Sequence, residues 1–292
     1  MRSGFVALVG RPNVGKSTLL NAMVGKHVAI ATPVPQTTRH TVRGVLHGDD
    51  VQVVFVDTPG LHRPRTLLGS RLNDMARDTL TDVDLLVWLV DGQAGIGTGD
   101  RFVAGLLDQV PTPTFAVLNK VDRMTPAAQL PALAELAGLG DFAEVVPVSA
   151  RDGDQVDVLT ELVVARMPEG PPYYPPQQVT DAGVDQQVSE RIREAAITRM
   201  REEVPHSIAV VIDEVTPGER DDVQVVHATI YVERDSQKGI VIGKRGAVLR
   251  EIGTQARPQV AALLGTRVHL DLRVGLMREW QRDPKALQRL GW

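Results

Sequence analysis

The chain has 292 residues, enough for two ordinary domains with separate buried cores. Hydrophobic residues make up 43% of it and charged residues 23%, which excludes a disordered, collagen-like or low-complexity protein. The absence of cysteine excludes a disulfide framework, a thiolate metal site and a cysteine nucleophile, and we expect the protein to be cytoplasmic.

The charge is divided unevenly along the chain. Residues 1–185 carry a formal charge of −6 and the remainder +2, within a total of −4. Between residues 238 and 289 there are 11 basic and 4 acidic side chains, a local charge of +7. Such a stretch can attract a polyanion, although a solvated basic surface explains the charge alone equally well.

The first half of the chain alternates short apolar runs with helix-like stretches. The runs predict strands at residues 5–9, 51–56, 85–90, 114–118 and 145–148. This alternation favours an α/β fold, with a mainly parallel sheet covered by helices on both faces.

A proline-rich stretch separates this part from the rest. Five prolines within residues 167–176 cannot continue a helix or a central strand, so we interpret the stretch as a semi-rigid linker. We expect domains at residues 1–168 and 186–292, joined by a linker at residues 169–185. After the prolines, the pattern predicts a helix at 184–202, strands at 208–215 and 223–233, helices at 247–252 and 254–264, a strand at 267–274 and a short helix near 284–290.

The first predicted strand is followed directly by a segment that fits the phosphate-binding loop pattern. Its eight residues are Gly10-Arg11-Pro12-Asn13-Val14-Gly15-Lys16-Ser17. They open a helix predicted at residues 18–24, which is the context that this pattern requires. The glycines let backbone N–H groups surround phosphates at the positive end of a helix. Lys16 can neutralise the β and γ phosphates, and Ser17 can ligate Mg²⁺. The sequence therefore predicts a nucleoside triphosphate site.

A second candidate segment, Asp57-Thr58-Pro59-Gly60, ends the strand predicted at residues 51–56. A carboxylate at this place can hold Mg²⁺ through water, while the Gly60 N–H meets the γ-phosphate. By itself such a tetrapeptide is more often a turn, so the interpretation depends on its place and spacing after the phosphate loop.

Two further segments indicate which base is bound. In Asn119-Lys120-Val121-Asp122, the Asp122 carboxylate can accept hydrogen bonds from N1–H and the 2-amino group of guanine, a donor pair that adenine lacks. Ser149-Ala150-Arg151 follows the last strand of this part, where a backbone N–H would meet guanine O6. Each segment alone is an ordinary turn; in this order they predict a guanine nucleotide.

Between the phosphate loop and the strand at 51–56, Gln36-Thr37-Thr38-Arg39-His40 offers a threonine, Thr38, that can reach Mg²⁺ when a γ-phosphate is present. With this fifth element the sequence resembles the translation-factor-related GTPases. Gln36-Thr37-Thr38-Arg39 and Asp57-Thr58-Pro59-Gly60-Leu61-His62 are similar to segments of the branch that acts in ribosome assembly. The resemblance implies a P-loop GTPase domain that slowly converts GTP to GDP and phosphate.

The resemblance also implies the bound groups, GTP or GDP with Mg²⁺, and the residues around them. Residues expected at the metal are Ser17, Thr38 and Asp57, and those expected to act in hydrolysis are Lys16, Thr38 and Gly60. Residues expected to bind the nucleotide are Gly10, Asn13, Val14, Gly15, Lys16, Ser17, Thr18, Asp57, Asn119, Lys120, Asp122, Ser149, Ala150 and Arg151.

Leu61 stands where many signalling GTPases carry a glutamine that orients water, and an apolar side chain cannot do this. Hydrolysis must then rely on Mg²⁺, Lys16 and backbone groups, with or without a second cation. Asn13 matches the asparagine that potassium-activated relatives use as a K⁺ ligand, by resemblance only. That Asn13 merely braces the loop is an equal alternative.

In the second part of the chain, Gly243-Lys244-Arg245-Gly246 lies between apolar helix-forming segments. Glycines permit close approach of a nucleic-acid backbone, and Lys244 and Arg245 supply charge for its phosphates. A Gly-x-x-Gly pattern alone is usually a plain turn. The order of the surrounding helices and strands, with the local charge of +7, resembles the type II KH domain, an α+β fold. This implies that Gly243, Lys244, Arg245 and Gly246 bind single-stranded RNA.

The resemblance covers nearly the whole chain and implies a GTP switch that binds small-subunit ribosomal RNA near its 3′ end and assists assembly of the 30S subunit. It implies a monomer without a DNA partner, and leaves open a weak peripheral association with the inner face of the cell membrane. Two alternatives remain. One is an RNA-binding module that senses the ratio of GTP to GDP with negligible catalysis. The other is a GTPase whose second domain binds protein or membrane.

Overall fold

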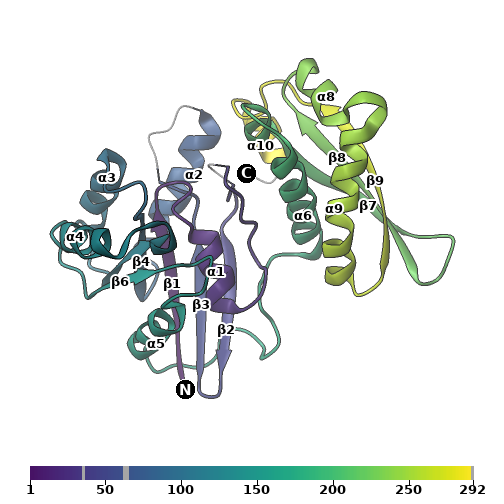
Figure 1. The fold of residues 1–292 in the computed structure, drawn as a ribbon. Helices are drawn as coiled ribbons and strands as arrows, with labels where there is room; N and C mark the ends of the chain where they lie inside the picture. The colour runs from purple at the N-terminus through teal and green to yellow at the C-terminus, as the bar shows by residue number, and fades with distance from the viewer. Residues whose placement is uncertain (35–36, 62–65, 291–292) are drawn as a thin grey trace. The chain divides into compact units, whose positions relative to one another are not determined.

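The computed structural model describes residues 1–34, 37–61 and 66–290, which form two compact units (Figure 1). The first takes in most of residues 1–181, and the second consists mainly of the chain from residue 182 onward. Gln36 and His62, which contribute to the sequence resemblance, lie outside the described residues. No helix in the described ranges is long and apolar enough to cross a membrane.

The first unit is built on a sheet whose described strands follow the order β2-β3-β1-β4-β5-β6. All neighbouring strands are parallel except β2 and β3, which form an antiparallel pair. The strands are β1 (Arg2–Gly10), β2 (Val42–Gly48), β3 (Val51–Asp57), β4 (Leu85–Asp91), β5 (Thr114–Asn119) and β6 (Glu144–Val148). The helices are α1 (Lys16–Val24), α2 (Leu67–Asp78), α3 (Thr98–Leu107), α4 (Pro126–Ala137) and α5 (Val156–Arg166), with a short 3₁₀ helix at Val121–Arg123.

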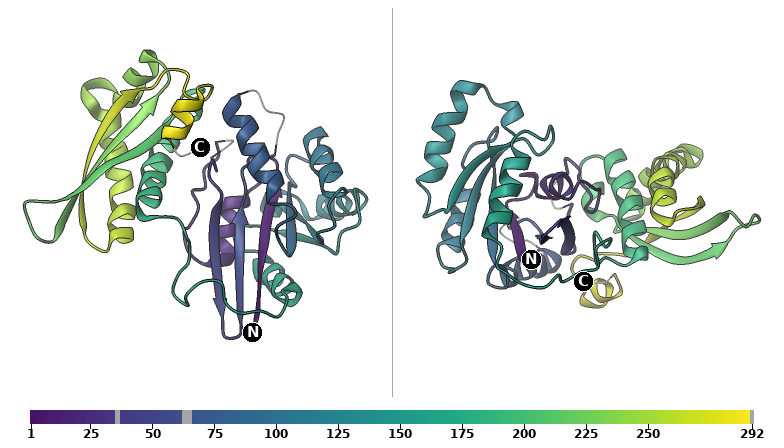
Figure 2. Two further views of the ribbon diagram at one scale, coloured as in Figure 1. Left: turned by 180° about the vertical axis from the view of Figure 1, so that it is seen from behind. Right: turned by 90° about the horizontal axis from the view of Figure 1, so that it is seen from below.

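Helices cover both faces of this sheet because its central strands are apolar on both sides. Successive side chains of a strand point to opposite faces. Val6 and Leu8 of β1 therefore pack in a core with α1 and α5, whereas Ala7 and Val9 pack in a second core with α2, α3 and α4. The helices of both layers can be followed in Figure 2. This confirms the predicted α/β fold, and it brings the loops that follow the parallel strands to one edge of the sheet.

The proline-rich segment after α5 is bound to the first unit. Gln52 of β3 is buried, with 1% of its surface exposed. Its Oε1 accepts hydrogen bonds from the backbone N–H groups of Tyr173 (2.6 Å) and Tyr174 (2.9 Å), and its Nε2 donates to the Tyr174 carbonyl (2.8 Å). A single amide thus satisfies three backbone groups of the segment.

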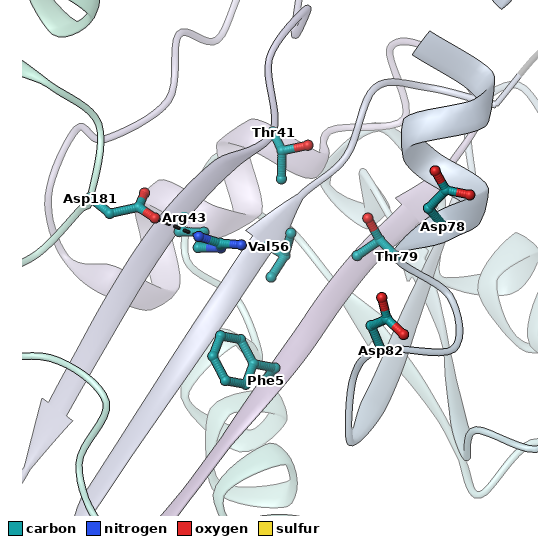
Figure 3. Close-up of a pocket in the computed structure, with 8 residues that line it drawn as sticks. All are labelled: Phe5, Thr41, Arg43, Val56, Asp78, Thr79, Asp82 and Asp181. Carbon is teal, nitrogen blue, oxygen red and sulfur yellow. Dashed lines mark hydrogen bonds and ion pairs between the residues drawn. The ribbon is translucent and has the colours of Figure 1, made fainter. Parts of the chain in front are cut away.

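The same segment then runs beside β2. The Val45 N–H of that strand donates to the Val179 carbonyl (2.9 Å), and Arg43 forms an ion pair with Asp181 at 2.7 Å. Figure 3 shows this pair beside a cavity of about 430 Å³. The cavity is lined by Phe5, Thr41, Arg43, Val56, Asp78, Thr79, Asp82 and Asp181, none of which belongs to the predicted nucleotide site.

In the second unit, the described strands form a sheet of order β7-β8-β9, with β7 and β8 antiparallel and β8 and β9 parallel. The elements are α6 (Val184–Arg199), α7 (Val204–Ser207), β7 (Ala209–Pro217), β8 (Val223–Val232), α8 (Asp235–Ile242), a 3₁₀ turn at Lys244–Gly246, α9 (Ala247–Leu264), β9 (Arg267–Leu276) and α10 (Pro284–Arg289). Helices α6 and α9 pack together and share one apolar core with the sheet (Figure 1). This is the predicted α+β arrangement.

Three features of the second unit differ from the sequence prediction. The helices expected at 247–252 and 254–264 are one helix, α9, with Pro258 inside it. Ile252, Ala256 and Val260, spaced by four residues, are all buried along it. This continuous apolar face outweighs the cost of about 1 kcal/mol for Gly253 in a helix. The helix predicted at 184–202 ends at Arg199, and α8 had not been delimited from the sequence.

Candidate functional site

The predicted phosphate loop joins β1 to α1 through a backbone that favours glycine. Gly10, Asn13 and Gly15 have φ angles of 146°, 67° and 103°. A Cβ on Gly15 would collide with the side-chain amide of Asn119. Glycine at this position therefore lets the loop pass close to β5 and turn directly into α1, so that the positive end of that helix lies at the loop.

Two opposite charges are buried beside the loop. Lys16 is 6% exposed and Asp57 is fully buried. The Lys16 ammonium donates to the carbonyls of Gly10 (3.4 Å) and Arg11 (3.2 Å). Burial lowers the pKa of Lys16, and Asp57 opposes that shift. Burial raises the pKa of Asp57, opposed first by Lys16 and then by hydrogen bonds from Ser17 and Thr38.

Ser17, Thr38 and Asp57 come together although they are far apart in the sequence. The Ser17 hydroxyl donates to Asp57 Oδ2 (2.6 Å), the Thr38 hydroxyl donates to the same oxygen (3.1 Å), and the two hydroxyl oxygens lie 2.9 Å apart. The other carboxylate oxygen, Asp57 Oδ1, is buried without a hydrogen-bond partner among the described residues. Oxygen ligands of this kind fit Mg²⁺. Asp57 Oδ1 is free to accept a hydrogen bond from a water molecule on such an ion.

The segment after Asp57 lies against the phosphate loop. A Cβ on Gly60 would lie 2.6 Å from the Pro12 nitrogen, so only glycine allows this approach. The Leu61 N–H donates to the Gly10 carbonyl at 3.1 Å. The Leu61 side chain is 1% exposed and packs in the core with α2 and α3. Leu61 therefore holds this segment in place through apolar contacts and does not present its side chain to the phosphate loop.

At the opposite end of the site, Asn119 connects three of the predicted segments. Its Nδ2 donates to the Val14 carbonyl (2.7 Å), and its Oδ1 accepts from the Ala150 N–H (3.0 Å). Both bonds are buried, so a change of this side chain would leave backbone groups of two loops unpaired. Asn119 is therefore placed to set the distance between the phosphate loop and the segment at 149–151.

Asp122, Ser149 and Arg151 form a cluster next to Asn119. The Ser149 hydroxyl donates to Asp122 Oδ1 at 2.7 Å. Arg151 Nη2 lies 2.9 Å from Asp122 Oδ2 as an ion pair, and that oxygen makes no hydrogen bond to a described residue. The Asp122 side chain is almost buried whereas that of Arg151 is exposed. Arg151 can therefore move aside when a base brings its own donors to the carboxylate.

Two acidic residues that the sequence had not indicated also contact this site. The Lys120 ammonium donates to the Asn13 carbonyl and to Asp91 Oδ2, both at 2.6 Å. The Arg11 guanidinium pairs with the fully buried Asp100 at 2.8 Å. In the sequence Asp91 is only the charged end of an apolar run, and Asp100 has no local signature.

The Gly-x-x-Gly segment of the second unit forms a tight turn between α8 and α9. Gly243, Arg245 and Gly246 have φ angles of 69°, 53° and 74°. A Cβ on Gly243 would collide with Val248. Lys244 and Arg245 are exposed at the turn. The arrangement presents two cations on a backbone that a nucleic-acid strand can approach closely.

A buried glutamine that the sequence had not indicated holds the start of α8. Gln237 Oε1 accepts hydrogen bonds from the N–H groups of Glu233 and Arg234, both at 3.0 Å. Its Nε2 donates to the Ser207 hydroxyl at 2.9 Å. Because α8 leads directly into the turn, Gln237 fixes the direction from which the two cations are presented.

The fold and both sites define the class of protein, a P-loop GTPase domain joined to a KH domain. Residues 5–120 match the family described as "50S ribosome-binding GTPase", and residues 203–281 match the KH domain family. GTPase Era of Mycobacterium avium is 56% identical over 100% of this chain and 99% of its own length. GTPase Era of Mycobacterium tuberculosis is 54% identical over 99% and 98%.

Solved structures agree. A crystal structure of Era in complex with MgGDPNP and nucleotides 1506–1542 of 16S ribosomal RNA has a TM-score of 0.97 and 36% identity, covering 100% of this chain and 99% of that one. A point variant of Aquifex aeolicus Era bound to GDP and AlF4⁻ has a TM-score of 0.96 at the same identity and coverage. The chain therefore belongs to the Era family of GTPases.

Proposed function

We propose that this chain binds GTP and GDP with Mg²⁺ and hydrolyses GTP slowly. We also propose that it binds the 3′-terminal part of 16S ribosomal RNA and assists assembly of the small ribosomal subunit. One observation supports the proposed nucleotide binding most directly. Asp57 accepts hydrogen bonds from the hydroxyls of Ser17 and Thr38 next to the buried Lys16. The relative solved with MgGDPNP and ribosomal RNA supports both proposals.

The residues divide the chemistry among them. Lys16 and the backbone N–H groups of the phosphate loop neutralise the phosphates, and Gly60 supplies a further backbone N–H. Ser17, Thr38 and Asp57 would hold Mg²⁺, which when bound supplies positive charge to the phosphate oxygens. Asp122 accepts the donor pair of guanine, while Ser149 and Asn119 orient the surrounding loops.

Slow turnover follows from the environment of Leu61. The Leu61 side chain is apolar and buried, so it cannot polarise the attacking water. We propose that ribosomal RNA or a ribosomal partner orders the segments around Thr38 and Gly60, and that hydrolysis rises when it is bound.

We further propose K⁺ as a second cation, with Asn13 as its ligand. Asn13 has a positive φ, and Lys120 holds its carbonyl. Turnover is to be measured in K⁺ and in Na⁺, for the wild type and for Asn13→Ala. We expect faster turnover in K⁺ for the wild type alone; equal rates in both salts would remove the proposal.

A monomeric state and a weak peripheral membrane association stay predictions from the sequence.

The alternative of a nucleotide sensor without catalysis is tested by single-turnover hydrolysis. Protein in excess over radiolabelled GTP is mixed with Mg²⁺, with and without an RNA of the 3′-terminal 16S segment. We expect slow release of phosphate by the protein alone and faster release with RNA. A sensor would release no phosphate in either reaction.

The alternative that the KH domain binds protein or membrane is tested by RNA binding at several salt concentrations. Replacing Lys244 or Arg245 by glutamine should weaken binding and lower the slope of log K against log salt by about 1 for each cation lost. Gly243→Asp should weaken it further. Arg267→Gln is the control, because Arg267 is an exposed cation of the same domain that pairs with Asp222. RNA binding that ignores both salt and these changes would favour the alternative.

A further inference from the structure

We propose that Asp91 and Asp100 are positioning residues that hold the phosphate loop on both sides of Pro12. Asp91 is the last residue of β4, and Asp100 lies in the first turn of α3. The connection between these two elements then acts as a brace for the loop. The inference rests on the nucleotide binding proposed above and extends it to residues outside the sequence motifs.

Asp91 holds the far side of the loop through Lys120. One carboxylate oxygen, Oδ1, accepts from the N–H groups of Gln93 (3.0 Å) and Ala94 (3.1 Å), which fixes the carboxylate to the turn after β4. The other, Oδ2, accepts from Lys120 at 2.6 Å, and the same ammonium donates to the Asn13 carbonyl at 2.6 Å. Lys120 is half-buried, and its ammonium lies between the carboxylate and the loop carbonyl.

Asp100 holds the near side directly, and its carboxylate is divided in the same way. Oδ2 accepts from the Gly97 N–H at 2.9 Å and fixes the start of α3. Oδ1 accepts from Arg11 at 2.8 Å. A Cβ on Gly99 would collide with the Arg11 side chain, so glycine at 99 allows the arginine to lie across the helix start. Asp100 is fully buried, and the ion pair is correspondingly sensitive to loss of either partner.

The two contacts matter because the loop backbone is costly to hold. Asn13 has a φ of 67°, in the left-handed region that residues other than glycine adopt uncommonly, although asparagine does so more readily than most. Arg11 and Asn13 flank Pro12, so fixing both determines where the intervening backbone lies. A loop already held in shape loses less freedom when phosphates bind.

The test measures release of a fluorescent GDP analogue from the full-length protein with Mg²⁺, at a temperature well below unfolding. Asp91→Asn and Asp100→Asn should each speed release by about tenfold or more and raise the KM for GTP more than they lower kcat. A double-mutant cycle sharpens the assignment. Adding Arg11→Gln to Asp100→Asn should change release little, because the two side chains act through one contact. Adding it to Asp91→Asn should multiply the two effects.

The matched control is Glu135→Gln, which breaks the exposed pair between Arg101 and Glu135 at 2.9 Å, an ion pair that also involves α3. It should release GDP at the wild-type rate. If Asp91→Asn and Asp100→Asn lower thermal stability but release GDP at the wild-type rate, both residues are merely structural and the proposal is wrong. If the wild type itself binds no GDP, the proposed function fails instead. Should Asp100→Asn not fold, Asp91→Asn decides alone.

Discussion

Asp122 shows how a single side chain can carry substrate choice. Its carboxylate is nearly buried; one oxygen accepts from the Ser149 hydroxyl, and the other forms ion pairs with Arg151 and, at 3.8 Å, with Arg123. A base that brings no donors of its own leaves this second oxygen without a hydrogen bond, which costs far more than a weaker contact elsewhere.

Asp122→Asn should therefore exchange guanine for xanthine. The asparagine amide still accepts from N1–H, but its NH₂ group now opposes the 2-amino group of guanine and suits the 2-carbonyl of xanthine. We expect GTP affinity to fall by about a hundredfold or more and xanthosine triphosphate to become the better ligand. Competition binding measures both. Asp152→Asn is the control, since Asp152 pairs with the same Arg151 but is exposed. Unchanged preference for GTP would contradict the role of Asp122.

Lys16 and Asp57 are two opposite charges buried beside the phosphate loop. They serve ligand binding at the expense of stability. Burial outweighs all the favourable contacts of Asp57, and its pKa is raised. The stabilising contribution of a carboxyl with a raised pKa is fully present below the ordinary aspartate value of about 3.9. It is lost as the pH rises through the higher native value.

Asp57→Asn should accordingly remove the loss of stability that the wild type shows as the pH rises through the native pKa of Asp57, and it should leave the buried Lys16 without its counter-charge. It should also abolish the stabilisation that Mg²⁺ with GDP gives the wild type. Urea unfolding between pH 4 and 8, with and without Mg²⁺ and GDP, measures both effects. Parallel pH curves for wild type and variant would show that Asp57 does not titrate in this way.

At the scale of elements, the proline-rich segment was expected to be a linker at residues 169–185. In the structure, the segment belongs to the first unit as far as Asp181. Gln52 binds it at Tyr173 and Tyr174, β2 binds it at Val179, and Arg43 binds it at Asp181. Strand β2 begins at Val42, so the segment is attached to the strand that follows Thr38, a residue that we propose at the metal.

Gln52→Leu should release the segment. The replacement keeps the buried volume but leaves two N–H groups and one carbonyl of residues 173 and 174 without partners. The expected loss in the free energy of unfolding is about 2–4 kcal/mol. Gln52→Glu keeps the acceptor and should lose less. Urea unfolding gives the stability, and limited proteolysis between residues 169 and 181 reports release. Resistance equal to that of the wild type would contradict the assigned role.

At the scale of the whole molecule, the two units have separate cores and different ligands. The cores of the GTPase unit lie on the two faces of its sheet, and the KH unit has one core of its own. The negative charge of the first part and the cluster of cations in the second match the separation of nucleotide chemistry from RNA binding.

Ligands should therefore stabilise the units separately. At a hundred times its dissociation constant, a ligand stabilises the unit that binds it by about 2.7 kcal/mol. We expect GDP with Mg²⁺ to shift one thermal transition and a 3′-terminal 16S RNA to shift another, measured by calorimetry. Lys244→Gln should reduce only the RNA shift. One transition moved equally by both ligands would show that the cores unfold together.

The sequence was most informative where neighbouring residues act together. The phosphate loop from Gly10 to Ser17 and the turn from Gly243 to Gly246 are local, since each lies between a predicted strand or helix and the next helix. Their glycines have the positive φ angles that such turns require. The parallel strands of the first sheet were predicted from their apolar runs, whereas the antiparallel edge strand β2 was not predicted from the sequence.

What the sequence did not indicate depends on partners distant along the chain. Asp91, Asp100, Gln52 and Gln237 each hold a functional loop or segment, and each is an ordinary polar residue in its local sequence. Their importance arises because folding brings each of them within hydrogen-bond distance of groups that belong to other segments of the chain. The unbroken course of α9 has the same origin, because burial of a shared apolar face outweighed the local preferences of Gly253 and Pro258. Short-range patterns thus determined the chemistry of the site, whereas burial and long-range pairing determined how its loops are held.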